Sequence, residues 1–120
     1  MRYMMLIVSG EGAWDHLSED EQRALYGRIG TWWNERAEAG EILEGHELQP
    51  AETATTVRRG PDGEVTVTDG PFVEAKETVG GYAILDVADL DAAIRLASEW
   101  PAAGSLEIRP LVDREDEPQG

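Results

Sequence analysis

The stretch "GGYAILDV", residues 80–87, has the hydrophobic pattern that decides the fold of this chain. Successive side chains of a β-strand point to opposite faces of a sheet. Tyr82 and Ile84 would therefore lie on one face, and Ala83, Leu85 and Val87 on the other. Because both faces are apolar, the pattern predicts a strand that is covered on both sides.

The N-terminal stretch "MRYMMLIV", residues 1–8, predicts a second strand of the same kind, from about Arg2 to Val8. A secretory signal is disfavoured, because no small-residue cleavage site follows and residues 11–21 are strongly acidic. Both faces of this strand are again apolar, with Met4, Leu6 and Val8 on one and Tyr3, Met5 and Ile7 on the other.

The segment that follows has the start, the period and the end signals of an amphipathic α-helix. Ser18 is a favourable N-cap, and Glu21 three positions later completes a capping box. Gly40 stands where a C-terminal cap is expected, and we interpret Gly27 and Gly30 inside the helix as points of close packing. The spacing predicts a core-facing stripe made of Leu25, Ile29, Trp32, Trp33 and Arg36.

A second helix is predicted after the 80–87 strand. Asp89 can cap its N-terminus, and Pro101 ends it. Its core-facing residues are predicted to be Leu90, Ile94 and Ala97.

Four further strands complete the expected elements. "EILEGHEL", residues 41–48, predicts one strand, with Gly45 at a bulge or at a close backbone approach. Residues 53–70 predict a β-hairpin around the tight turn "GPDG", and "SLEIRPLV", residues 105–112, predicts the last strand. The strand at 41–48 would place four side chains on one face: Ile42, Glu44, His46 and Leu48.

The order of these elements is β-α-β, an inserted β-hairpin and β-α-β. It predicts a ferredoxin-like α+β sandwich, in which two helices cover one face of an antiparallel sheet. The other apolar face would then need cover from outside the chain, most simply from a second copy, so we expect a homodimer. We expect one domain over residues 1–112 and a mobile acidic tail over residues 113–120.

The composition argues against several classes of function. The chain has 25 acidic and 10 basic residues, for a net charge of −15, so we expect neither nucleic-acid binding nor association with anionic membranes. It has no cysteine, and its two histidines lack metal-ligand spacing. No apolar run approaches the roughly 18 residues that span a bilayer. We expect a cytoplasmic protein without a metal or cofactor.

The stretch "TVTDGPFVEAKETVGGY", residues 66–82, is the candidate ligand site. One interpretation is structural, because Asp, Gly and Pro suit a turn that ends the hairpin. The other is the rim of a pocket, because an aromatic residue and alternating charges precede two glycines that permit a close backbone approach. The candidate ligand-binding residues are Gly70, Pro71, Phe72, Glu74, Lys76 and Tyr82.

Asp69 and His46 are the candidate catalytic residues. Histidine is the side chain that titrates near neutrality without help, and His46 lies mid-strand between acidic residues. His16, just before the first helix, is expected to be a solvated loop residue. A structural role is open for both candidates, as a strand histidine and as a turn aspartate that hydrogen-bonds backbone amides.

Three segments resemble the YCII-related family, and specifically its DGPF-motif branch: "DGPFVEAKETVGGY" (69–82), "MRYMMLIV" (1–8) and "GHELQPAETATTVR" (45–58). The resemblance covers residues 1–112. It implies a chain of the dimeric α/β-barrel type, in which two sheets pack face to face. It also implies a cleft near the sheet edge, where an aspartate and a histidine are a proposed acid/base pair.

Two functions are consistent with these observations. The first is a homodimer that binds or processes an unknown small molecule, with Asp69 and His46 as an acid/base pair. The second is a non-catalytic regulatory module, because the branch resembles proteins encoded beside, or fused to, sigma factors of the extracytoplasmic-function type. The sequence specifies no substrate and no reaction.

Overall fold

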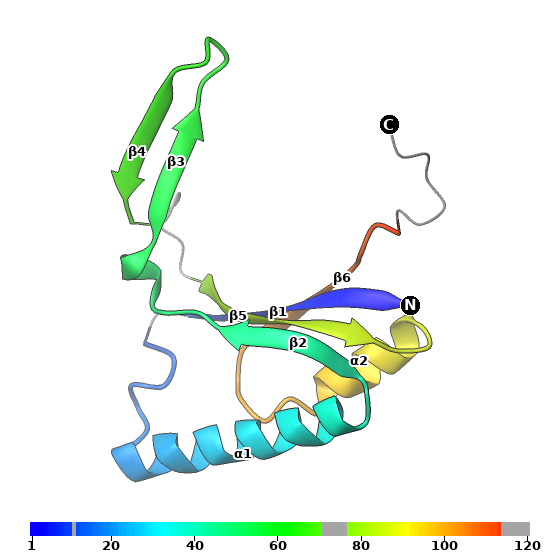
Figure 1. The fold of residues 1–120 in the computed structure, drawn as a ribbon. Coiled ribbons are helices and arrows are strands. Elements are labelled where there is room, and N and C mark those ends of the chain that lie inside the picture. The colour runs from blue at the N-terminus through cyan, green and yellow to red at the C-terminus, as the bar shows by residue number, and fades with distance from the viewer. Residues whose placement is uncertain (11, 71–76, 114–120) are drawn as a thin grey trace.

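The computed structural model describes residues 1–10, 12–70 and 77–113, and Figure 1 shows how its elements are arranged. The tail predicted to be mobile lies outside the described residues, apart from Asp113. In chain order the elements are β1 (Arg2–Gly10), α1 (Glu19–Glu38), β2 (Ile42–Glu47), the short 3-10 helix η1 (Ala51–Thr53), β3 (Thr55–Arg59), β4 (Val65–Asp69), β5 (Glu77–Asp86), α2 (Leu90–Ser98) and β6 (Ser105–Pro110).

The elements form a mixed α/β fold that is consistent with a ferredoxin-like α+β sandwich. Four strands make an antiparallel sheet in the order β2-β5-β1-β6, so the two doubly apolar strands, β5 and β1, lie in its centre. Helices α1 and α2 lie on one side of this sheet (Figure 1). The strands β3 and β4 form a separate two-stranded sheet, which stands away from the rest of the chain.

Helix α1 begins and ends at the residues that the sequence predicts. The Glu21 amide donates a hydrogen bond of 3.1 Å to Ser18 Oγ, and the Ser18 amide donates one of 3.0 Å to Glu21 Oε1. These two bonds form a capping box. The pKa of the Glu21 carboxyl is lowered, chiefly by the hydrogen bond from the Ser18 amide and further by the Ser18 side chain. After the helix, Gly40 has a φ of +79°, and its amide donates to the Ala37 carbonyl. Glycine takes this left-handed conformation without strain, which ends the helix.

The hydrophobic core lies between the sheet and the helices. Met5 and Leu85, from the two central strands, are fully buried. Trp32 of α1 packs edge-on against Trp33 and Trp100, with ring centroids 6.4 and 5.3 Å apart. The buried residues of the cluster are Tyr3, Met5, Trp32, Ile42, Ala83, Leu85, Val87, Ala93 and Leu96.

Gly45 lets α1 approach β2 closely. A Cβ atom at this position would collide with the indole ring of Trp33 and lie 2.5 Å from the Tyr82 carbonyl oxygen. The predicted close backbone approach is therefore confirmed. Gly27 and Gly30 differ, because a Cβ atom at either position would have no atom outside the local helix within 4 Å. The prediction that they are points of close packing is wrong.

Two predicted faces also need correction. In β2 the register shifts between Ile42 and Glu44, so Ile42 pairs with Leu85 in the core while Glu44 pairs with Ile84 on the opposite face. The extra residue interrupts the simple alternation of the strand, as a β-bulge does. The prediction that Ile42, Glu44 and His46 share a face is therefore wrong for Ile42.

In α2 the core-facing stripe differs from the predicted one at Leu90 and Ile94, whereas Ala97 packs against the core as predicted. Ala93 and Leu96 are buried, whereas Leu90 and Ile94 are 48% and 47% exposed. Ala93 and Leu96 belong to the buried core cluster, so α2 turns this side toward the sheet. Helical spacing alone offers both stripes, since residues three and four apart lie on neighbouring faces.

We expect Trp32→Ala to lower the free energy of unfolding by about 3–5 kcal/mol, because it empties the centre of the core. Chemical denaturation followed by circular dichroism measures this loss. Trp14→Ala is the matched control, since Trp14 is only half-buried and packs against Tyr26 at the surface. An equal loss in both variants would contradict the central position of Trp32.

We expect Gly45→Ala to destabilise the protein by about 1–3 kcal/mol, because the added methyl group overpacks the contact with Trp33. The control is Gly27→Ala in α1, where the space is open and alanine should add up to about 1 kcal/mol of stability. Thermal and denaturant unfolding of the two variants should therefore move in opposite directions. A stabilising Gly45→Ala would disprove the proposed contact.

Candidate functional site

The face of the sheet that points away from the helices is apolar and has no cover among the described residues. In the sheet, residues directly opposite each other on neighbouring strands share a face. Met4 pairs with Ile84, Leu6 pairs with Tyr82, and Val8 pairs with Val79. We call these residues the open face: Met4, Leu6, Val8, Val79, Tyr82 and Ile84.

Polar side chains border the open face on both edge strands. On β6, Glu107 lies opposite Leu6 and Arg109 lies opposite Met4. On β2, Glu44 and His46 lie on the same face, because they pair with Ile84 and Tyr82. The open face is therefore an apolar band between two polar margins.

His46 and Tyr82 form the most specific contact at the edge of this band. Their ring centroids are 5.9 Å apart, with a tilt of 51° between the ring planes. His46 itself is exposed, and Glu44 two positions earlier is exposed on the same side. The arrangement presents an imidazole, a phenol and a carboxylate to the same region of solvent.

Of the two acidic neighbours of His46, Glu47 faces the other way. Its carboxylate accepts a hydrogen bond of 2.9 Å from the Tyr26 hydroxyl of α1. This bond raises the pKa of Tyr26, because the neighbouring carboxylate favours the neutral phenol. Glu47 therefore connects β2 to α1, which leaves Glu44 as the acid on the side of His46.

Two candidate residues, Asp69 and Gly70, lie at the base of the β3–β4 hairpin. Asp69 is the last residue of β4, pairs with Thr55 and is exposed. Gly70 has a φ of +98°, and its amide donates to the Ala54 carbonyl at 2.7 Å. Its carbonyl accepts a hydrogen bond from the Thr56 hydroxyl at 2.7 Å. Gly70 thus has a clear structural role in closing the hairpin.

The structure brings together only some of the predicted site residues. His46 and Tyr82 are in contact, but within the described ranges no hydrogen bond or ion pair joins Asp69 to His46. Four other candidates, Pro71, Phe72, Glu74 and Lys76, lie outside the described residues. His16 is exposed in the segment before α1, as expected.

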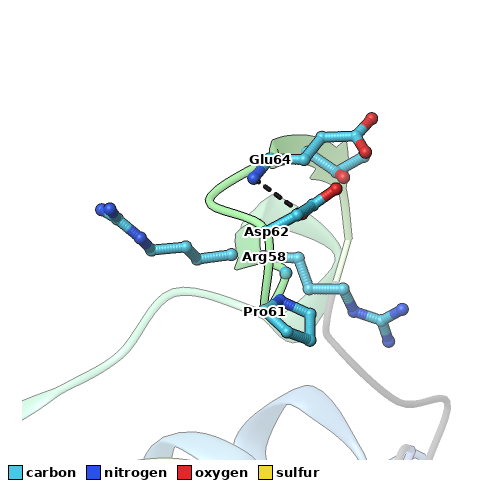
Figure 2. A pocket seen from close by; sticks show the side chains of 7 residues that line it. Arg58, Pro61, Asp62 and Glu64 are labelled. Carbon is cyan, nitrogen blue, oxygen red and sulfur yellow. Dashed lines mark hydrogen bonds between the residues drawn. The ribbon is translucent and has the colours of Figure 1, made fainter.

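An open hollow of about 500 Å³ lies at the tip of the β3–β4 hairpin, far along β4 from Asp69. Figure 2 shows it, with Asp62 accepting a hydrogen bond of 3.0 Å from the Glu64 amide. This bond and one from the Gly63 amide to the Gly60 carbonyl shape the turn. The hollow reflects the form of an exposed turn with charged side chains, and it contains none of the candidate site residues.

Two sequence-based expectations concern features that the described residues lack. Neither helix in residues 12–70 and 77–113 is long and apolar enough to cross a membrane. Across the same described ranges, no group of three or more His, Asp or Glu residues is arranged to hold a metal ion. The cytoplasmic location stays a prediction.

Sequence reasoning missed two details of this region. The alternation predicts that Glu44 and His46 share a face, which the register confirms, but Glu44 is absent from the candidate site residues. The shift of register between Ile7 and Val8, which leaves Gly80 of β5 between two pairs, was also missed. The paired glycines at 80 and 81 were the available signal for it.

Comparison with known proteins identifies the family of the chain. Residues 1–114 match the YCII-related domain. A protein of Rhizobium meliloti (strain 1021), described as uncharacterized, is 33% identical over 115 residues, which cover 92% of each chain. The match spans both central strands, the His46–Tyr82 edge and the hairpin, and it shows that this chain belongs to the YCII-related family.

Proposed function

We propose that this protein is a homodimer that binds, and through Asp69 and His46 processes, a small molecule at the edge of its open face. The observation that carries the proposal is the position of the His46–Tyr82 pair at the margin of an uncovered apolar band. The DGPF-type motif at residues 69–82, by its resemblance to that branch of the family, supports a site formed by the same part of the chain.

The dimer follows from the chemistry of the open face. The open-face side chains are partly exposed, and Val79 is 42% exposed. An apolar patch that is rimmed by polar residues and in contact with water is typical of a protein–protein contact or a ligand site. Two such faces packed together would remove apolar surface from water on both chains, which is the main driving force for association. The polar margins, with Glu44 and His46 on one side and Glu107 and Arg109 on the other, would then lie at the rim.

Such a rim is a favourable place for a small ligand. Pockets that bind small molecules are mostly apolar, with a few convergent polar groups that orient the ligand. Tyr82 and Ile84 offer an apolar wall, and His46 and Glu44 offer a proton donor or acceptor and a carboxylate. Asp69 would complete the acid/base pair from the base of the hairpin. The reaction class is not specified by these residues.

We expect the wild-type protein to have a mass of about twice 13.2 kDa at micromolar concentration, measured by light scattering after size-exclusion chromatography. Leu6→Asp should produce a monomer, because an unpaired carboxylate in the centre of the interface is costly to bury. Leu90→Asp is the matched control, because Leu90 is an exposed residue of α2 and lies on the side of the sheet away from the open face. A folded wild-type protein that stays at 13.2 kDa would contradict the dimer.

We expect a thermal-shift screen of pooled metabolites to find a ligand that stabilises the wild-type protein by mass action. His46→Gln and Asp69→Asn should each weaken its binding at least tenfold while preserving the dimer. His16→Gln is the control, because His16 lies outside the proposed site and should leave binding unchanged.

The ligand found in the screen tests the position of the site and the processing of the ligand separately. Unchanged affinity in both His46→Gln and Asp69→Asn would move the site elsewhere. A ligand that binds at the site but is recovered chemically unchanged, after incubation with enough protein to detect slow turnover, would disprove processing. That result would favour the regulatory module associated with a sigma factor.

A further inference from the structure

The β3–β4 hairpin, which we call the arm, extends from the body of the protein, and no further described strand pairs with either of its strands. It comprises β3, the turn at residues 60–64, and β4. Its main-chain hydrogen bonds join its own strands or close its base. A two-stranded hairpin is marginally stable at best in water when nothing packs against it. The arm is therefore expected to have a partner surface.

One face of the arm is apolar and exposed. Val57 lies directly opposite Val67, and Val65 follows on the same face opposite Arg59. All three valines are exposed: Val57 to 64%, Val65 to 55% and Val67 to 65%. The opposite face is polar, and it carries Thr56, Arg58, Thr66 and Thr68. We call the face that carries Val57, Val65 and Val67 the valine face.

The arm stands on the same side of the sheet as the open face. In Figure 1 the helices α1 and α2 lie on one side of the sheet, and the arm projects on the other. A second copy that covers the open face would therefore lie beside the arm. In a two-fold symmetric dimer the same contact is made twice, because each arm lies beside the other copy.

The area of the sheet also favours a second contact. Four strands spaced about 4.8 Å apart, with about six residues of about 3.4 Å each, cover about 400 Å² in plane. Stable interfaces bury about 800 Å² of accessible surface on each partner. The open face supplies a large part of this area, and the valine face of the arm would add to it.

The charge of the arm fits contact with a copy of the same chain. Residues 55–69 contain two arginines and three acidic residues, for a net charge of −1, which leaves −14 on the rest of the chain. Two copies of so acidic a chain repel each other, and the repulsion is smallest where a nearly neutral segment makes the contact. Arg59, on the valine face near the tip, would approach an acidic partner.

We propose that the arm clasps a second copy of the chain, with Val57, Val65 and Val67 packed on the body of that copy. This inference rests on the homodimer proposed above, and it adds a specific consequence for the site. Asp69 pairs with Thr55 and lies on the valine face, two positions from Val67. A clasped arm would hold Asp69 at the contact between the copies, so the proposed ligand site would be formed by both chains.

Hydrogen exchange of the unmodified protein is the first test. We expect the amides of residues 55–69 to exchange at least tenfold more slowly above the dimer dissociation constant than below it. In the monomeric Leu6→Asp variant these amides should exchange fast at every concentration. Equal exchange of the arm in the wild-type dimer and in the Leu6→Asp monomer would overturn the clasp, and it would leave the sheet-to-sheet dimer intact.

The second test changes the valine face and measures the dimer by sedimentation equilibrium. Val57→Thr with Val67→Thr keeps β-branched side chains but removes apolar contact area, and it should weaken the dimer at least tenfold. Thr66→Ser with Thr68→Ser, on the opposite face, is the matched control and should have little effect. An unchanged dissociation constant in the valine variant would overturn the clasp, whereas a monomeric wild-type protein would overturn both the clasp and the homodimer.

Discussion

A sheet that is apolar on both faces, with two α-helices to cover it in the described part of the chain, is the constraint on which the rest of this structure depends. The two central strands alternate between side chains that are buried against the helices, such as Met5 and Leu85, and side chains that are not, such as Leu6 and Tyr82. The helices α1 and α2 cover one face, where the core cluster lies. The open face retains apolar surface that an isolated chain leaves in contact with water, and this surface underlies both the proposed dimer and the proposed site.

Contacts with α1 hold β2, the strand that carries His46, in position. Trp33 packs over Gly45, directly beside His46 in the sequence, and Tyr26 bonds to Glu47 on its other side. These contacts fix β2 from the face opposite to the His46 side chain. Dense packing has a cost here, since Trp32 Nε1 is buried and has no hydrogen-bond partner among the described residues. The apolar contacts of the three clustered tryptophans offset that cost.

The sequence predicts features that depend on regular periods or on local hydrogen bonds. The central strands, the capping box at Ser18 and the close approach at Gly45 follow from patterns of this kind. Features that depend on register are not predictable in the same way. One extra residue near Leu43 moves Ile42 into the core while His46 faces the opposite side, and the alternation in the sequence contains no sign of that shift. The side that α2 turns to the core, with Ala93 and Leu96 buried, is likewise decided by tertiary packing and not by helical spacing alone.

The predictability of the candidate site is limited in the same way, because its contacts depend on register and on tertiary packing. The contact of His46 with Tyr82 is a cross-strand pair, so it becomes visible only when the register of β2 and β5 is known. Asp69 belongs to the arm, whose strands pair only with each other among the described residues, so its position relative to His46 depends on what holds the arm. If a second copy holds it, site assembly and dimerisation are thermodynamically linked. A ligand that binds only the assembled site must then strengthen the dimer by the same factor by which dimerisation strengthens its binding.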